Sequence, residues 1–177
     1  MNSNENTLNS SLVISTTNDN IMWLIDMRLS SKEDLDKFIM FVCNRNINNK
    51  YIVKASLSFI YESEEKLTSL GKLGLSALII TDAIINNIQI SPILIRICKQ
   101  FNVWIDVSTD RSKKTETLRV PKLFHGVCLG FDDDKIWDLI ASKVLSQINT
   151  RIFVYGVSDH DSMIKLFNWV DYITHSN

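Results

Sequence analysis

The stretch from Ala77 to Thr109 constrains the fold most, because it contains two short apolar segments separated by one amphipathic segment. Residues 77–80 and 103–107 are nearly continuous apolar runs of the length that buried parallel strands have. The segment between them carries Pro92, and a helix tolerates proline in its first turn. Its apolar positions follow the i, i+3, i+4, i+7 pattern of one helix face at Leu94, Ile97, Cys98 and Phe101. The stretch therefore predicts a right-handed βαβ unit, whose functional side chains would follow the carboxyl ends of the strands.

The rest of the chain repeats this alternation of strand and helix. Further strands are predicted at Met22–Met27, Tyr51–Ser58, Gly126–Phe131, Ile152–Val157 and Val170–Ile173, with Ser11–Ser15 as a further short candidate. Helices are predicted from a capping box at Ser30 and Glu33 to about Asn46, over Ser63–Leu70, after a cap at Asp132 or Asp133, and after a cap at Asp159. About seven strands thus alternate with five helices, as a parallel sheet covered by helices requires.

This alternation predicts an α/β fold, a trimmed or incomplete (β/α) TIM-like barrel. A complete barrel of this kind needs about 250 residues, and the chain has 177, so we expect the loss mainly before Tyr51. A doubly wound open parallel sheet is the alternative. We expect residues 1–20 to form a flexible N-terminal segment and residues 21–177 to form a single α/β barrel domain.

Composition and charge narrow the classes of function. A formal net charge of −1 gives no global field to recruit nucleic acid or anionic lipid, so we expect neither direct nucleic-acid binding nor membrane binding. The N-terminal sequence has no signal-peptide pattern, and no apolar run is long enough for a membrane span. The cysteines Cys43, Cys98 and Cys128 are odd in number and far apart, which favours buried thiols in a reducing cytoplasm over disulfides.

Two motifs in the central stretch resemble those of EAL domains, the barrel family that hydrolyses cyclic di-GMP. Residues 79–82 read Ile-Ile-Thr-Asp where that family has Glu-Ile-Thr-Glu, and residues 106–109 read Asp-Val-Ser-Thr where it has Asp-Asp-Phe-Gly. The order and spacing of later segments extend the resemblance from about Tyr51 to Ser176. A glycerophosphodiesterase barrel, which also ends with a strand, a helix and a VDxI pattern, is the chief rival family.

The resemblance implies that most of the family's chemical groups are replaced. Ser56 stands where the family has a metal-holding asparagine, Ile79 where it has a metal-binding glutamate, and Val107 where it has the second aspartate of a pair whose first member is kept as Asp106. The remaining positions that match family motifs are Asp82, Cys128, Gly130, Tyr155 and Ser158, with Cys128 and Gly130 in place of the catalytic lysine and its aspartate, and Tyr155 in place of a glutamate.

One carboxylate at a strand end does not hold Mg²⁺, which requires near-octahedral oxygen coordination. Other acids and histidines near the predicted strand ends could form an unrelated metal site: Asp82, Asp110, Asp132, Asp133, Asp134, Asp159, His160 and His175. Several of these aspartates open predicted helices, where carboxylates accept free N–H groups, and this structural role is the stronger interpretation. We therefore expect no bound metal and no cofactor, and a structural role for His125.

A polar loop after the central stretch carries the main cluster of positive charge: Arg111, Lys113, Lys114, Arg119 and Lys122. Such a run is usually a solvated loop, and Glu116 interrupts it. In EAL proteins the loop after the aspartate pair contributes to metal binding and dimerisation, so the resemblance makes this loop a candidate partner surface. Trp104, Trp137 and Trp169 are expected in packing positions, because they are not interleaved with the basic residues.

The resemblance implies a catalytically inactive EAL-like regulatory protein that acts through protein contacts. Family members with eroded motifs often bind transcription regulators or other regulators of motility, fimbriae or virulence. The alternatives are a non-hydrolysing cyclic di-GMP receptor and a divergent metal-dependent phosphodiesterase. The oligomeric state and the identity of the partner are open at the level of sequence.

Overall fold

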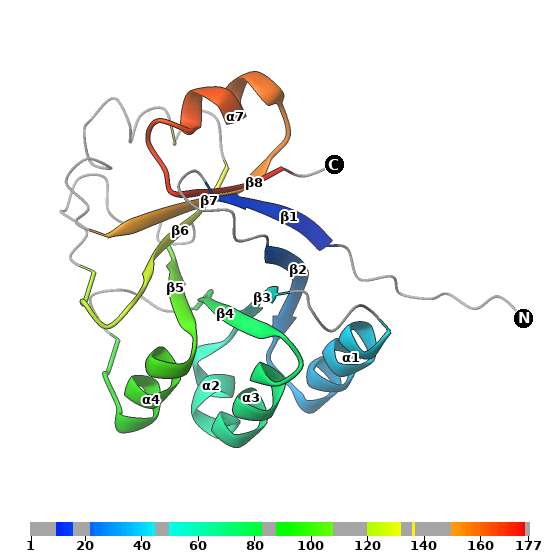
Figure 1. Ribbon diagram of the computed structural model, residues 1–177. Helices are drawn as coiled ribbons and strands as arrows, with labels where there is room; N and C mark the ends of the chain where they lie inside the picture. The colour runs from blue at the N-terminus through cyan, green and yellow to red at the C-terminus, as the bar shows by residue number, and fades with distance from the viewer. Residues whose placement is uncertain are drawn as a thin grey trace, which may run out of the picture.

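Eight strands form a closed ring in the computed structural model of the chain (Figure 1). The structure describes residues 10–15, 22–44, 50–82, 88–107, 120–131, 136 and 150–175. The strands follow the chain order around the ring: β1 (Ser10–Ser15), β2 (Met22–Leu29), β3 (Lys50–Ala55), β4 (Leu75–Ile80), β5 (Asn102–Asp106), β6 (Gly126–Gly130), β7 (Arg151–Val157) and β8 (Tyr172–His175). The predicted trimmed TIM-like barrel is thereby confirmed, and the open-sheet alternative is wrong.

The ring closes through β1, which differs from the other strands in direction. β1 pairs antiparallel with β2 on one side and with β8 on the other, whereas neighbouring strands from β2 to β8 all pair parallel. Ser10–Ser15 lies within the segment 1–20 that we expected to be flexible. This expectation is corrected for these six residues, because hydrogen bonding to strands on both sides makes them part of the barrel.

Helices cover the outside of the ring, and their bounds refine the predicted ones. They are α1 (Lys32–Cys43), α2 (Leu57–Glu62), α3 (Glu64–Gly71), α4 (Pro92–Gln100) and α7 (His160–Leu166). In Figure 1, α1 to α4 lie along the β2–β5 side of the barrel and α7 lies by β7 and β8. The helix predicted after Asp132 or Asp133 falls outside the described residues, except for Ile136, which is helical and buried.

The amino ends of the helices show why they begin where they do. The hydroxyl of Ser31 accepts the N–H of Asp34, so the cap of α1 is Ser31 and the predicted capping box at Ser30 and Glu33 is shifted by one residue. Ser91 caps α4 just before its N-terminal proline, and Asp159 caps α7 as predicted. Helix α2 was missed, because its first residues were assigned to a strand ending at Ser58, whereas β3 ends at Ala55.

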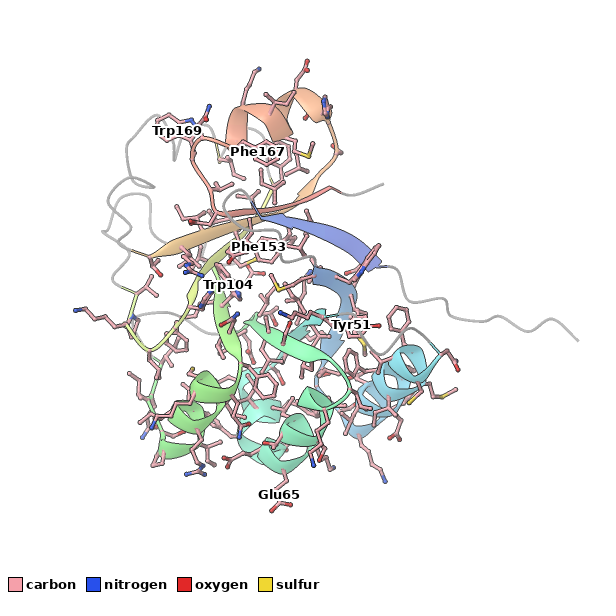
Figure 2. The ribbon with its side chains drawn as sticks, viewed as in Figure 1. Tyr51, Glu65, Trp104, Phe153, Phe167 and Trp169 are labelled. Carbon is pink, nitrogen blue, oxygen red and sulfur yellow. The ribbon has the colours of Figure 1, made fainter. Side chains whose placement is uncertain are left out.

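Two apolar clusters hold the barrel together, one on each face of the sheet. Outward-facing strand residues such as Val53, Leu78 and Ile105 pack with helix residues such as Phe38 and Leu67. The inner cluster fills the lumen and contains Val13, Met22, Leu24, Ile52, Ala77, Ile79, Trp104, Cys128, Phe153 and Tyr172. Figure 2 shows Trp104 and Phe153 at the centre of the ring. Burial of both faces explains why these strands lack the polar alternation of a one-sided sheet.

Several single-residue expectations need correction. Cys43 is exposed and Cys98 is partly buried, and only Cys128 is a fully buried thiol; all three are free. Trp104 is buried as expected, but Trp169 is 48% exposed. Trp137 lies outside the described residues. Among the described residues, none of the helices has the length and apolarity that crossing a membrane requires.

Candidate functional site

The carboxyl ends of the parallel strands form one mouth of the barrel, and most of the motif positions lie there. Alternation along each strand places Lys54 of β3, Asp106 of β5, Gly130 of β6 and Tyr155 of β7 on the inner face. These residues follow, toward the mouth, the lumen residues Ile52, Trp104, Cys128 and Phe153. The structure therefore brings Asp106, Cys128, Gly130 and Tyr155 together at this end of the lumen.

Asp106 is the carboxylate at the centre of this mouth, and it is already engaged by a neighbour. Its side chain belongs to a residue only 3% exposed. The Tyr155 hydroxyl donates a hydrogen bond to Asp106 Oδ2 at 2.8 Å. A buried carboxylate oxygen needs such a donor, because burial without one costs about 1–3 kcal/mol or more. The phenol thus stabilises Asp106 inside the protein.

Lys54 lies over the face of the Tyr155 ring. Its Nζ is 4.5 Å from the ring centroid, within the range of a cation–π contact. The side chain is half-buried, so the ammonium group remains within reach of solvent. Lys54, Tyr155 and Asp106 consequently lie together at the mouth, joined through the tyrosine, and we call them the mouth triad.

Gly130 provides the space that Tyr155 occupies. A Cβ atom added at Gly130 would lie 3.3 Å from the Tyr155 hydroxyl oxygen and 3.4 Å from its Cζ. A side chain at position 130 would therefore press against the tyrosine that binds Asp106. Glycine at 130 and tyrosine at 155, the two positions matched to family acids, fit each other as a pair.

Ile79 and Cys128 offer nothing polar to a ligand at the mouth. Ile79 is fully buried and pairs in register with Trp104, one inward-facing level deeper than Asp106. Cys128 is fully buried as well. Burial raises the pKa of the Cys128 thiol well above its ordinary value, and the adjacent Asp106 raises it further. Cys128 therefore stays protonated and is a poor nucleophile or metal ligand in the folded protein.

Ser56 and Asp82 are bound to nearby structure. The Ser56 hydroxyl accepts the N–H of Phe59 and so caps α2. Asp82 Oδ1 accepts the backbone N–H of Leu57 at 2.9 Å, and Asp82 Oδ2 lies 3.4 Å from Nη2 of Arg28. Both groups of this ion pair are partly solvated, so it contributes little stability. Ser56 and Asp82 hold the start of α2 against the ends of β2 and β4.

The remaining motif positions point elsewhere. Val107 is half-buried, packs against the outer core, and donates its N–H to the carbonyl of Cys128. Ser158 is exposed after the end of β7. Neither residue joins the mouth triad.

The described residues contain no group of three His, Cys, Asp or Glu side chains that could hold a metal ion. Asp159 caps α7 through Ser162 N at 2.7 Å, and this bond lowers the Asp159 carboxyl pKa. His160 is exposed on the same helix. Asp110, Asp132, Asp133, Asp134 and the side chain of His175 lie outside the described part. The carboxylates at the described mouth are Asp106, bound by Tyr155, and Asp82, paired with Arg28, and these two engaged groups do not fit a divalent cation.

The predicted partner loop is described only at its end. Lys122 is exposed, and Arg111, Lys113, Lys114 and Arg119 lie outside the described residues.

Sequence reasoning missed two cations at the mouth, Lys54 and Arg28. A signal for Lys54 was present, because a lysine stands at an inward position of the otherwise apolar run Tyr51–Ala55. Such a residue is costly to bury without a partner, so its presence there points to a polar end of the lumen.

Comparison with solved structures finds the same barrel in the EAL enzyme Bd1971, in its form bound to cAMP and cyclic-di-GMP. The two structures superpose with a TM-score of 0.55 at 13% sequence identity, over 95% of this chain and 60% of that one. The chain thus spans about three fifths of the length of that enzyme. No known protein family matches the sequence, and no curated protein matches it. The fold is that of an EAL-like α/β barrel, and at this identity the similarity concerns the fold alone.

Proposed function

We propose that the chain is a catalytically inactive EAL-like domain that regulates another protein by direct contact. One observation carries the proposal: Asp106 at the mouth is buried and accepts a hydrogen bond from Tyr155, whose ring lies against Gly130. Phosphodiester hydrolysis assisted by metals needs several oxygens converging on the cations, which activate water and neutralise the phosphate. Where such oxygens would be needed, the described mouth has the mouth triad and apolar side chains.

The resemblance favours a transcription regulator as the partner and the basic loop as the surface that binds it. A loop of net positive charge would be steered toward an acidic surface, and the association rate would then fall with ionic strength. The fold alone does not select a partner, so the proposal for this surface needs its own test.

That test is affinity capture from the native cell with the intact protein as bait. We expect one regulator to be enriched, and we expect enrichment to be lost when the basic loop is neutralised by Arg111→Gln, Lys113→Gln, Lys114→Gln, Arg119→Gln and Lys122→Gln. A matched control removes exposed lysines from the helices by Lys66→Gln and Lys99→Gln. Equal loss with both baits, or none with either, would contradict a role of the loop.

A non-hydrolysing cyclic di-GMP receptor is the second candidate, and the cations at the mouth favour it. Arg28 and Lys54 lie at the ends of adjacent strands, and neither is fully buried, so either could contact a phosphate. Isothermal titration with cyclic di-GMP separates the two candidates. The regulator proposal predicts no binding at physiological dinucleotide concentrations, whereas a receptor predicts saturable binding that Lys54→Met weakens.

A further inference from the structure

The opposite end of the barrel, where the parallel strands begin, contains a polar cluster that the proposed function does not use. His125 directly precedes β6, Arg151 is the first residue of β7, and Asp171 and Tyr172 stand at the start of β8. Arg151 Nη1 lies 2.8 Å from Nε2 of His125 and 3.3 Å from the hydroxyl of Tyr172. We call these residues the floor cluster.

The chemistry of the pair fixes the protonation state of the histidine. An arginine guanidinium is always protonated and can only donate hydrogen bonds. Nε2 of His125 must therefore accept, which places the single ring proton on Nδ1 and leaves the imidazole neutral. A protonated His125 would turn this acceptor into a second donor and would put two cations 2.8 Å apart.

The position of the ring is held by groups that do not titrate in the neutral range. The backbone N–H of His125 donates to the carbonyl of Val103 in β5 at 2.8 Å. The imidazole packs edge-on against Trp104, with ring centroids 4.9 Å apart. Trp104 in turn contacts the rings of Phe153 and Tyr172. A change in the charge of His125 would consequently act directly on the aromatic packing at the bottom of the lumen.

We propose that the bond between His125 and Arg151 is a proton-sensitive latch, which ties the segment entering β6 to β7 and β8 above its titration point and opens below it. The charged and titratable groups that face His125 are Arg151 on β7, which opposes protonation, and Asp171 and Tyr172 at the start of β8. Asp171 favours the protonated ring electrostatically, but Asp171 Oδ2 also accepts the N–H of Ile152 at 2.8 Å. Protonation of His125 therefore breaks its hydrogen bond to Arg151, and the attraction to Asp171 offsets only part of that loss.

The direction of the effect on stability follows from linkage. Burial lowers the pKa of His125 from its ordinary value of 6.5, and Arg151 lowers it further, while Asp171 opposes them. The unfolded chain thus binds this proton more tightly than the folded one. The contribution of the latch is fully present above pH 6.5 and is lost as the pH falls through the folded-state pKa of His125.

NMR titration of the intact protein labelled with ¹⁵N-histidine tests the latch without a substitution. We expect His125 to titrate below 6.5 with Nδ1 protonated in the neutral form, and Arg151→Met to move this pKa upward. A His125 that titrates at or above 6.5, or whose pKa is unchanged by Arg151→Met, would overturn the proposal.

A second measurement compares urea unfolding at pH 7.5 and pH 5.5. The unfolding constant of the wild type should rise on acidification, by at most about tenfold at pH 5.5, because that pH lies one unit below the unfolded pKa of 6.5. His125→Gln, which keeps an acceptor that does not titrate, should remove this part of the pH dependence. The control is His160→Gln, since His160 is exposed on α7. Equal pH dependence in the wild type and in His125→Gln would show that no latch operates.

Discussion

Two glycines of β6 each lie against an aromatic ring from a neighbouring strand. Gly130 faces Tyr155 at the mouth, and Gly126 faces Trp104 at the floor. A Cβ atom at Gly126 would meet the carbonyl oxygen of Arg151 and would lie 2.5 Å from Cζ3 of Trp104. The rings of Trp104 and Tyr155 thus occupy space in the lumen that side chains at positions 126 and 130 of β6 would otherwise fill. This explains how a short barrel can close around a tightly packed interior.

Among the described glycines with negative φ, Gly126 should be the one at which substitution by alanine destabilises the protein most. The added methyl group meets backbone that cannot move aside, so we expect a loss of at least about 2 kcal/mol in the free energy of unfolding. Urea denaturation monitored by circular dichroism measures this loss. Gly71→Ala is the matched control, because its Cβ would lie 3.4 Å from the Phe101 ring, an ordinary contact. A Gly126→Ala protein as stable as Gly71→Ala would refute the tight packing of Trp104 on β6.

Tyr155→Phe tests the hydrogen bond to Asp106. The substitution removes one donor from a buried carboxyl group and changes no apolar packing, so we expect a loss of about 1–3 kcal/mol. Tyr61→Phe is the comparison, because its hydroxyl also donates a bond of 2.8 Å, to the carbonyl of Gln89, but at an exposed site. The Tyr61 variant should lose less than about 1 kcal/mol. If both variants lose the same amount, the mouth triad does not depend on a buried bond.

Placing an acid at position 130 tests whether Gly130 and Tyr155 fit each other as a pair. Gly130→Asp should displace the Tyr155 ring and destabilise the protein by about 1–3 kcal/mol. The double variant with Tyr155→Ala should be less unstable than the sum of its two single variants, since the clash is then absent. Strictly additive losses in a denaturant-based double-mutant cycle would contradict the pairing.

At the scale of single elements, helix caps show where sequence reasoning succeeds and where it stops. Asp159 was placed correctly as the cap of α7, and its side chain accepts the N–H of Ser162. At α1 two serines compete, and each is followed three residues later by an acid, Glu33 or Asp34. The sequence could not choose between the two registers, because the choice depends on which face of the helix meets the sheet. Helix α2 was missed for a related reason, since Ser56 reads equally well as a strand end or a cap.

Ser31→Ala should cost about 1 kcal/mol of stability, the usual value for the loss of an N-cap side chain. Ser31 Oγ accepts from Asp34 N and donates to Asp34 Oδ2. Ser30→Ala should cost less, because the Ser30 hydroxyl only donates to Asp34 Oδ2 and caps no backbone group. Thermal or urea denaturation of the two variants decides between the registers, and a larger loss for Ser30→Ala would favour the one that the capping-box motif predicted.

At the scale of the whole molecule, the alternation of apolar strands and amphipathic helices was sufficient to predict the barrel but not its closure. The strand β1 is a six-residue segment whose direction no pattern encodes, and only its pairing with β2 and β8 shows that it closes the ring. Similarly, alternation along a strand apolar on both faces cannot tell which face turns inward. Only the structure shows that Ile79, Asp106 and Tyr155 face the lumen and its mouth. That they lie toward the same end of the barrel follows from the parallel strands that the sequence predicts.

At the scale of the whole molecule, the proposed function requires that the mouth of this EAL-like barrel does not support phosphodiester hydrolysis. The most direct measurement is a single-turnover assay with the protein in excess over cyclic di-GMP, in Mg²⁺ and separately in Mn²⁺, with the products separated and identified by mass. We predict no linear dinucleotide above the level without protein, under conditions in which an active EAL phosphodiesterase converts all of the substrate. Product formation that requires the metal and disappears with Asp106→Asn would contradict the account.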